Sequence, residues 1–145
     1  MAYQITISIL CAIIAGISRA VSNKIVFHYR SSVFRYRDWF NPEKSWRNKW
    51  KLVDGNPLKV NGKLVERYPG SSTIFVLFTD AFHLFEFIFR IAFATSFILA
   101  TMLLAKSNWF AFSYLVVYLI FAGTFHIFFT FIFTRQPKEH KNPNA

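Results

Sequence analysis

The chain has 145 residues, of which 54% are hydrophobic and 20% aromatic, and it carries 19 phenylalanines and a formal net charge of +10. A soluble core of this size cannot bury so many large apolar rings, whereas lipid can cover the outer faces of membrane-spanning helices. The composition therefore excludes an ordinary soluble globular domain. The single cysteine, Cys11, excludes an intrachain disulfide and a cysteine-based metal cluster.

The first apolar run covers residues 2–21 and is uncharged until Arg19. Its length of about 20 residues matches a hydrocarbon core of roughly 30 Å, so we predict a transmembrane helix. Ala12 and Gly16 form a small-xxx-small pair, which is typical of a helix-packing face. A cleaved signal peptide is the alternative. Because no lysine or arginine precedes the apolar run, we expect it to remain as an anchor.

The basic segment that follows covers residues 22–70, with eleven lysines and arginines against four acids and a net charge of +7. We expect residues 22–40 to prolong the first helix beyond the membrane. Asn41 followed by Pro42 is typical of a helix start, because asparagine caps the free backbone N–H groups and proline suits the first helical position. A short helix near residues 42–50 is therefore predicted.

The end of the basic segment has the pattern of a small sheet. Asp54-Gly55 and Asn61-Gly62 separate short stretches of alternating apolar and polar residues. Such pairs favour tight hairpin turns. We predict a β-hairpin or a two- to three-stranded meander.

A second apolar run begins after Pro69-Gly70, where Ser71, Ser72 or Thr73 can cap a helix. We predict a long helix within residues 71–105, running from about residue 74. Its length of roughly 48 Å exceeds the hydrocarbon thickness, so the first turns should lie among headgroups or in the cytoplasm. A tight turn over 106–109 then leads to a third span within 109–134 and a polar tail, 135–145.

The predicted fold class is thus an all-α integral membrane protein with about three transmembrane helices and a small basic insertion. With three spans, the basic segment and the basic tail share a side, and the positive-inside rule places both in the cytoplasm. The N-terminus is then outside and the C-terminus inside. We expect a multi-pass protein of a bacterial cytoplasmic membrane.

A stripe of ionisable residues enters the second span. Asp80, His83, Glu86 and Arg90 fall on one face of a helix, and Glu86 and Arg90 are spaced for an ion pair. If the second and third spans form an antiparallel hairpin, the numbers of two contacting residues sum to about 215. His126 then lies near Arg90, and Arg135 lies near Asp80. These residues could form an inner-leaflet polar network with the stripe. The simpler interpretation is that these charges lie near the cytoplasmic end and reach the headgroups.

The network could also conduct protons or ions, or bind a metal. Buried ionisable groups in membranes often mark proton, ion or substrate paths, and two histidines with two acids could hold a metal. We predict no catalytic residues, metal site or cofactor, because no catalytic or metal-binding motif is present. A metal, or a haem ligated by His83 or His126, stays an open alternative.

Basic and aromatic residues alternate in the juxtamembrane segment, where tryptophans suit the interface and cations contact anionic lipid. We predict headgroup contact for Arg35, Arg37, Trp39, Trp46, Arg47, Lys49 and Trp50. A protein partner could use the same surface. Nucleic-acid binding is not predicted, because the juxtamembrane location already accounts for both residue types.

The sequence favours a structural or accessory subunit of a membrane complex, docked on anionic lipid and joined to copies of itself or to other membrane subunits. The many phenylalanines of the last two spans leave surface for such partners. The rival hypothesis is a small transporter, channel or membrane enzyme that uses the ionisable stripe as a relay for protons, ions or a metal.

Overall fold

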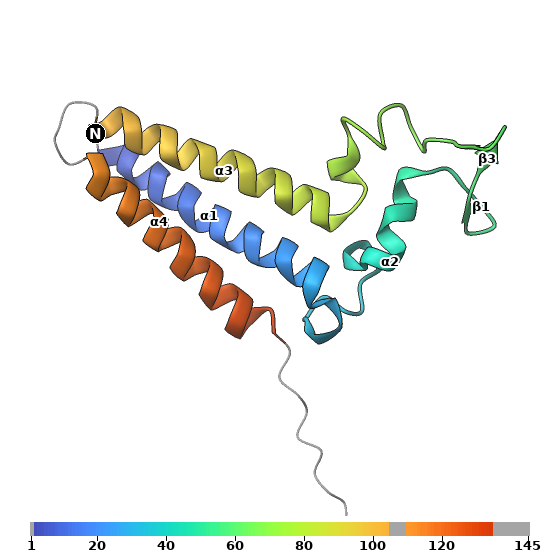
Figure 1. The fold of residues 1–145 in the computed structure, drawn as a ribbon, viewed down its shortest axis with the longest axis horizontal. Helices are drawn as coiled ribbons and strands as arrows, with labels where there is room; N and C mark the ends of the chain where they lie inside the picture. Colours follow the sequence, from blue (N-terminus) through green and yellow to red (C-terminus); the bar gives the residue numbers. More distant parts are fainter. Residues whose placement is uncertain (1, 105–109, 135–145) are drawn as a thin grey trace, which may run out of the picture.

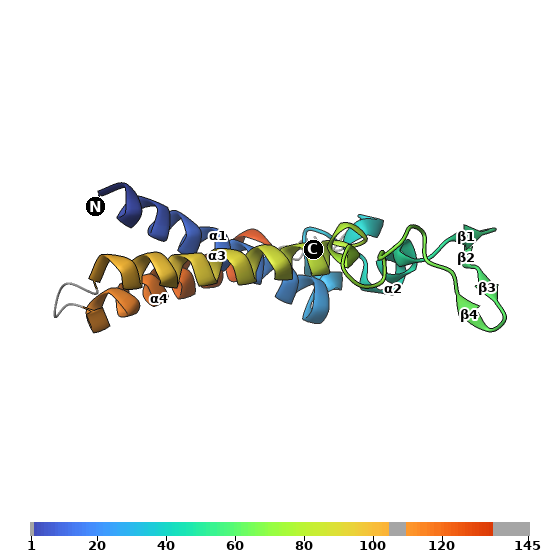
Figure 2. The same ribbon diagram turned by 90° about the horizontal axis from the view of Figure 1, so that it is seen from above.

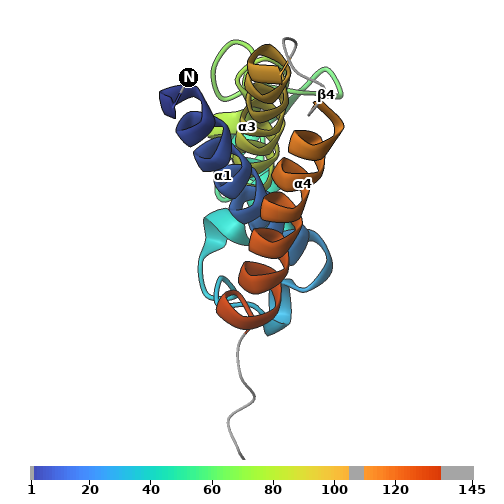
Figure 3. The same cartoon turned by 90° about the vertical axis from the view of Figure 1, so that its left-hand side faces the viewer.

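The computed structural model describes residues 2–104 and 110–134, and these residues are mostly helical. Three long helices dominate: α1 (Ala2–Phe27), α3 (Ala81–Leu104) and α4 (Phe110–Ile127). In Figure 1, α1 lies between the other two, and α3 runs in the opposite direction to both. Seen end-on in Figure 3, they form a small bundle.

Each long helix contains an apolar window that is long enough to cross a membrane: Tyr3–Phe27, Ala81–Met102 and Tyr114–Ile132. The predicted number of membrane-length helices is therefore confirmed. α4 ends in a π-helical turn, Phe128–Ile132, which is closed by a 2.8 Å hydrogen bond from the Phe133 N–H to the Phe128 carbonyl. The last helical element is thus close to the predicted third span.

Small residues let α1 pack closely against both neighbours. Ala12 is fully buried in a cluster with Ala100 of α3 and Val117 of α4. At Gly16, an added Cβ would lie 2.8 Å from the Phe121 carbonyl oxygen of α4, so only glycine fits there. The predicted packing pair thus lies where the three helices meet.

A pair of serines joins α1 and α3 in the half of their contact that includes the N-terminal part of α1. The Ser8 hydroxyl donates to the Ser96 carbonyl at 2.9 Å, and the Ser96 hydroxyl donates to the Ser8 carbonyl at the same distance. Both side chains are buried. Reciprocal bonds of this kind satisfy polar groups that an apolar environment would otherwise leave unpaired.

The first helix is shorter than predicted, because it ends at Phe27 and does not continue to residue 40. The chain then makes a 3₁₀ turn, Tyr29–Ser31, and the Ser32 hydroxyl donates to the Tyr29 carbonyl at 2.7 Å. Ser32 also forms a β-bridge with Thr134, just after α4. This pairing draws the backbone out of the helix, and a local sequence pattern cannot reveal it.

The short helix after residue 41 forms as expected. α2 (Pro42–Ser45) is capped by the Asn41 side chain, which accepts a 2.9 Å hydrogen bond from the Glu43 N–H. A 3₁₀ turn, Trp46–Lys49, continues it. α2 and this 3₁₀ turn together cover most of the predicted helix over residues 42–50.

Two successive hairpins replace a single meander. β1 (Leu52–Val53) pairs with β2 (Asn56–Pro57), and β3 (Lys59–Val60) pairs with β4 (Lys63–Leu64), as two separate antiparallel sheets. Figure 2 shows both hairpins at the far end of the extension, beyond the helix ends.

The turn residues explain these hairpins. Asp54 and Gly55 have φ angles of 49° and 76°, and Asn61 and Gly62 have 51° and 76°. Positive φ at both central positions is the mark of the tight type I′ turn, which asparagine, aspartate and glycine tolerate best. The turns were therefore predictable from their sequence alone.

The second long helix begins at Ala81, later than the predicted start near residue 74. Residues 71–75 form turns after Gly70, whose φ is 78°, and Val76–Phe78 form a 3₁₀ turn. Asp80 takes the capping role that was predicted for Ser71, Ser72 or Thr73, since its carboxylate accepts a 3.0 Å hydrogen bond from the His83 N–H. The expected helical extension over residues 74–80 therefore does not form.

Candidate functional site

Most of the buried polar side chains lie at the end of the bundle where the basic segment emerges. They come from the last turns of α1, the first turn of α3 and the chain around α2. In Figure 1 this is the end near α2. The predicted ionisable stripe begins there, so this polar layer is the candidate site.

Glu86 of α3 lies at the centre of the first polar group. Arg19 of α1 donates a hydrogen bond to its Oε1 atom, and the Ser22 hydroxyl donates to the same oxygen at 2.9 Å. The predicted partner, Arg90, is more distant, with its Nε atom 3.8 Å from Oε2 and its side chain 77% exposed. The closer ion pair therefore joins two helices.

The role of Arg19 was not predicted from the sequence. It is the only charged residue within the first apolar run, which is a signal that it has a partner. Its guanidinium carbon also lies 5.1 Å from the centre of the Phe89 ring. The partner could not be identified, because the pairing depends on how α1 and α3 are rotated against each other.

Asp80 and His83 form the second polar group. Asp80 is buried, and both of its carboxylate oxygens lie 2.8 Å from the His83 Nδ1 atom. The Thr79 hydroxyl lies 3.4 Å from Asp80. When Nδ1 carries the proton toward Asp80, the other ring nitrogen, Nε2, is left to accept a hydrogen bond.

The basic segment is tied to the start of α3 by side chains that bond to backbone groups. Asn48 donates to the Thr79 carbonyl at 2.9 Å, and the Ser71 hydroxyl donates to the Lys49 carbonyl at 2.6 Å. These bonds hold the chain around α2 against the polar groups of α3. Neither bond was predicted from the sequence.

Lys24 is a buried cation that the predicted site did not include. Its ammonium group donates to the Thr134 hydroxyl at 2.7 Å and lies 3.9 Å from the centre of the Phe129 ring. These contacts join the end of α1 to the end of α4. Cation–π contacts stabilise a desolvated lysine by about 2 kcal/mol.

The structure does not bring the whole predicted network together. His126 is exposed, and its ring packs edge-on against Phe131. Within residues 2–104 and 110–134 it has no hydrogen bond to the acids of α3. In the middle of α3 the two helices pair as predicted, with the Phe93 ring against the Phe121 ring, but α4 then diverges from α3 (Figure 1). Arg135 lies outside the described residues.

The residues predicted to contact headgroups divide into two kinds. Arg37, Trp46 and Arg47 are exposed. Trp39 packs on the buried cluster of Val21, Ile25 and Ala81, and Trp50 is half-buried beside the hairpins. The remaining two are half-buried, Lys49 beside a cavity and Arg35 against Tyr36.

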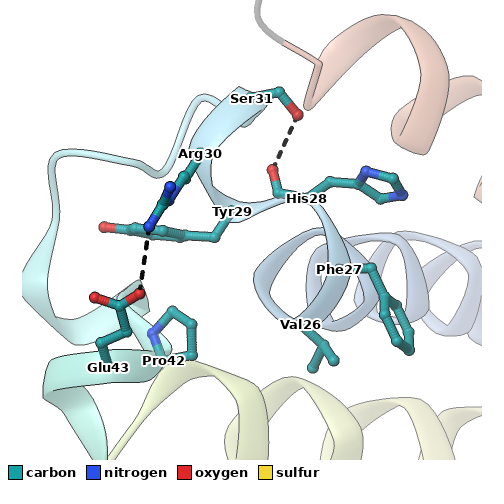
Figure 4. A pocket seen from close by; sticks show the side chains of 8 residues that line it. All are labelled: Val26, Phe27, His28, Tyr29, Arg30, Ser31, Pro42 and Glu43. Atoms are coloured by element: carbon teal, nitrogen blue, oxygen red, sulfur yellow. Dashed lines mark hydrogen bonds and ion pairs between the residues drawn. The ribbon is translucent and has the colours of Figure 1, made fainter.

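Two of the cavities at this end of the molecule lie beside α2 and the end of α1. The larger has a volume of about 330 Å³ and is lined by Val26 to Ser31 together with Pro42 and Glu43. Figure 4 shows Arg30 reaching across it to Glu43, and the closest atoms of this ion pair are 3.8 Å apart. The smaller, about 130 Å³, lies against the Asp80–His83 pair.

Outside the long helices, Glu66, Lys44 and Tyr29 have shifted pKa values. Hydrogen bonds from the Ser72 hydroxyl and from the Gly70 and Ser72 N–H groups lower the pKa of Glu66. A hydrogen bond to Asp38 raises the pKa of Lys44. Burial raises the pKa of Tyr29, and the charge of Asp38 adds to the effect.

Comparison with known proteins identifies no relative: no family model, curated protein or solved structure matches the chain. Among residues 2–104 and 110–134, no group of three or more histidine, cysteine, aspartate or glutamate side chains is placed to hold a metal ion. The arrangement can pair charges between helices, and it presents a histidine, a lysine and a serine to the smaller cavity.

Proposed function

We propose that the chain spans a bacterial cytoplasmic membrane three times and serves as a non-enzymatic subunit of a membrane complex, with its basic segment against anionic headgroups in the cytoplasm. The observation that carries the proposal is the uncovered apolar surface of the helices. Only 6% of the window Tyr114–Ile132 is buried within the chain. Lipid or partner helices must cover such a surface.

The side chains on the outer faces support this proposal. They include Ile14 of α1, Ile91 and Ile98 of α3, and Leu115 and Leu119 of α4, all about half exposed or more. In water, this much exposed apolar surface would be strongly unfavourable. In a bilayer, the same side chains meet a solvent of matching polarity.

The charges support the proposed orientation. The basic segment leaves the bundle at the end where α4 also finishes, so the +7 of residues 22–70 and the basic tail begin on one side (Figure 1). The hairpins reach beyond that end, and Val53, Lys59 and Val60 are exposed there. This extension suits a partner in the aqueous phase.

Tryptophan quenching tests the headgroup contact. The Trp109→Phe variant leaves tryptophans only at positions 39, 46 and 50, all in the basic segment. In reconstituted vesicles, brominated phosphatidylglycerol should quench their fluorescence more than brominated phosphatidylcholine. Equal quenching by both lipids would count against anionic docking.

The mass of the particle in mild detergent tests the subunit role. The proposal expects a particle larger than the 17.0 kDa chain with its bound detergent, formed by self-association or by a stoichiometric partner. A strictly monomeric particle without a copurifying protein would contradict it.

The rival role, a relay through the polar layer, is favoured by one observation. His83 is hydrogen-bonded to a buried carboxylate, an arrangement that also orients catalytic and proton-transferring histidines. Glu86 gives less support, because it is already paired with arginines from two helices. If His83→Gln abolishes ion or proton flux in vesicles while the protein stays folded, the relay is favoured. Unchanged or absent flux counts against it.

A further inference from the structure

The smaller cavity combines an apolar wall with polar groups at the boundary of the bundle. Ile25 and Phe82 line it from α1 and α3, while Ser45 and Lys49 line it from the chain around α2. The hydrogen-bonded pair of Asp80 and His83 also lines the cavity. An amphipathic ligand has the matching distribution of apolar and polar groups.

Ser45 offers a hydroxyl group to a ligand in the cavity. The residue is only 6% exposed, yet its hydroxyl makes no hydrogen bond to any residue that the structure describes. Buried hydroxyls normally have a partner, either protein or an ordered ligand or water. The Ser45 hydroxyl is therefore free to donate to a polar group in the cavity.

Lys49 and His83 define which polar group fits. The Lys49 ammonium has no ion pair or hydrogen bond among the described residues, so it is available to an anion. The Asp80 carboxylate accepts bonds from the His83 N–H and Nδ1. This arrangement leaves the Nε2 atom of His83 to accept from a hydroxyl group.

The size of the cavity suits a small polar group. Its volume is about 130 Å³, which accommodates a phosphate group with a short hydroxylated fragment. The larger cavity is a weaker candidate, because its cation, Arg30, is 93% exposed and faces Glu43.

We propose that this cavity binds the phosphodiester of a phospholipid with a small hydroxylated headgroup of the glycerol type. Lys49 and Ser45 donate to the phosphate oxygens, and His83 Nε2 accepts from the headgroup hydroxyl. Ile25 and Phe82 contact the glycerol backbone of the lipid. This inference rests on the proposed membrane insertion, and it adds one defined lipid site to the general attraction of a basic surface.

Native mass spectrometry of the protein in detergent, titrated with phosphatidylglycerol, tests the site. Lys49→Met should weaken binding about tenfold, which corresponds to about 1.4 kcal/mol, because the variant lacks the cation that donates to the phosphate. Ser45→Ala should weaken it severalfold. Lys51→Met is the matched control, because it removes an exposed lysine of the same segment, and its binding should stay within about twofold. Equal losses for the two lysine variants would overturn the proposal.

Two further probes separate the ligand's parts. Phosphatidylmethanol has the same charge but no headgroup hydroxyl, so it should bind several times more weakly than phosphatidylglycerol, and His83→Phe should remove that preference. Soluble glycerol phosphate supplies the same phosphate without acyl chains. If it competes at the same concentration as the lipid, the site belongs to a soluble phosphate and the lipid assignment is wrong.

Failure of the site can be distinguished from failure of the proposed function. If phosphatidylglycerol binds the wild type but Lys49→Met, Ser45→Ala and His83→Phe leave the affinity unchanged, the cavity assignment is overturned while headgroup docking stands. If brominated phosphatidylglycerol gives no preferential quenching and binds no tighter than phosphatidylcholine, both fail.

Discussion

Replacing Gly16 with alanine tests the close contact between α1 and α4. The new Cβ would lie 2.8 Å from the Phe121 carbonyl oxygen, 2.8 Å from the Thr124 Cβ and 3.0 Å from the Phe125 nitrogen. Ordinary contacts begin near 3.4 Å, so α4 would have to move away by about 0.6 Å. Two of the three atoms belong to the backbone of α4, so a side-chain rotation cannot relieve the clash.

The expected cost is about 1–3 kcal/mol, the range for overpacking a tight contact. Reversible unfolding in mixed micelles with increasing dodecyl sulfate, followed by circular dichroism, measures this loss. Gly123→Ala is the matched control, because nothing lies within 4 Å of its Cβ position. That variant should be neutral or more stable by up to about 1 kcal/mol, since alanine favours helix more than glycine. If Gly16→Ala is as stable as Gly123→Ala, the packing of α1 against α4 is wrong.

Three other predictions follow from the polar layer and the turns. Arg19→Met should destabilise the bundle by about 1–3 kcal/mol, because it leaves the Glu86 carboxylate without its close partner. Arg90 is exposed, so Arg90→Met should change the stability by less than about 0.5 kcal/mol. The same unfolding assay compares the two variants, and equal losses would refute the pairing of Arg19 with Glu86. Asp80→Ala should cost about 0.5–2 kcal/mol and fray the first turn of α3, which hydrogen exchange at the His83 amide reports; unchanged protection would contradict the capping role. Glu66 has a lowered pKa in the folded state, so its hydrogen bonds stabilise the turn at neutral pH and are lost as the pH falls through that lowered pKa. An NMR titration of the Gly70 and Ser72 amides should show a midpoint below about 4.3, the ordinary pKa of glutamate. A midpoint at or above that value would contradict the bonds.

The parts of the fold that depend on local chemistry could be predicted from the sequence. Three apolar runs of membrane length gave the helices, and Asn41-Pro42 marked α2. The turns at Asp54-Gly55 and Asn61-Gly62 followed from residues that tolerate positive φ. In each case the cause lies within a few residues of the effect.

The helix ends could not be predicted, because they depend on distant partners. α1 stops at Phe27 as the chain turns to form a β-bridge between Ser32 and Thr134, which are far apart in sequence. Near residue 71, several capping residues compete. Ser71 bonds to the Lys49 carbonyl instead, and Asp80 becomes the cap.

The candidate site was predictable only in part. The stripe on α3 was visible because its members recur with helical spacing, and two of its contacts, Asp80 with His83 and Glu86 with Arg90, lie within one helix. Arg19 comes from another helix, and its pairing requires the rotation that Ala12 and Gly16 help to set. His126 was placed by assuming that the antiparallel helices α3 and α4 stay in contact along their whole length, whereas they diverge.

The most direct test of the proposed topology is the accessibility of single cysteines in intact cells. Cys11→Ser removes the only natural cysteine, and Ser107→Cys or Lys59→Cys then places one thiol in the α3–α4 connection or in β3. A membrane-impermeant maleimide should label Ser107→Cys in intact cells and Lys59→Cys only after permeabilisation. Labelling of both positions from the same side of the membrane, or release of the protein by alkaline carbonate, would contradict the three-span orientation.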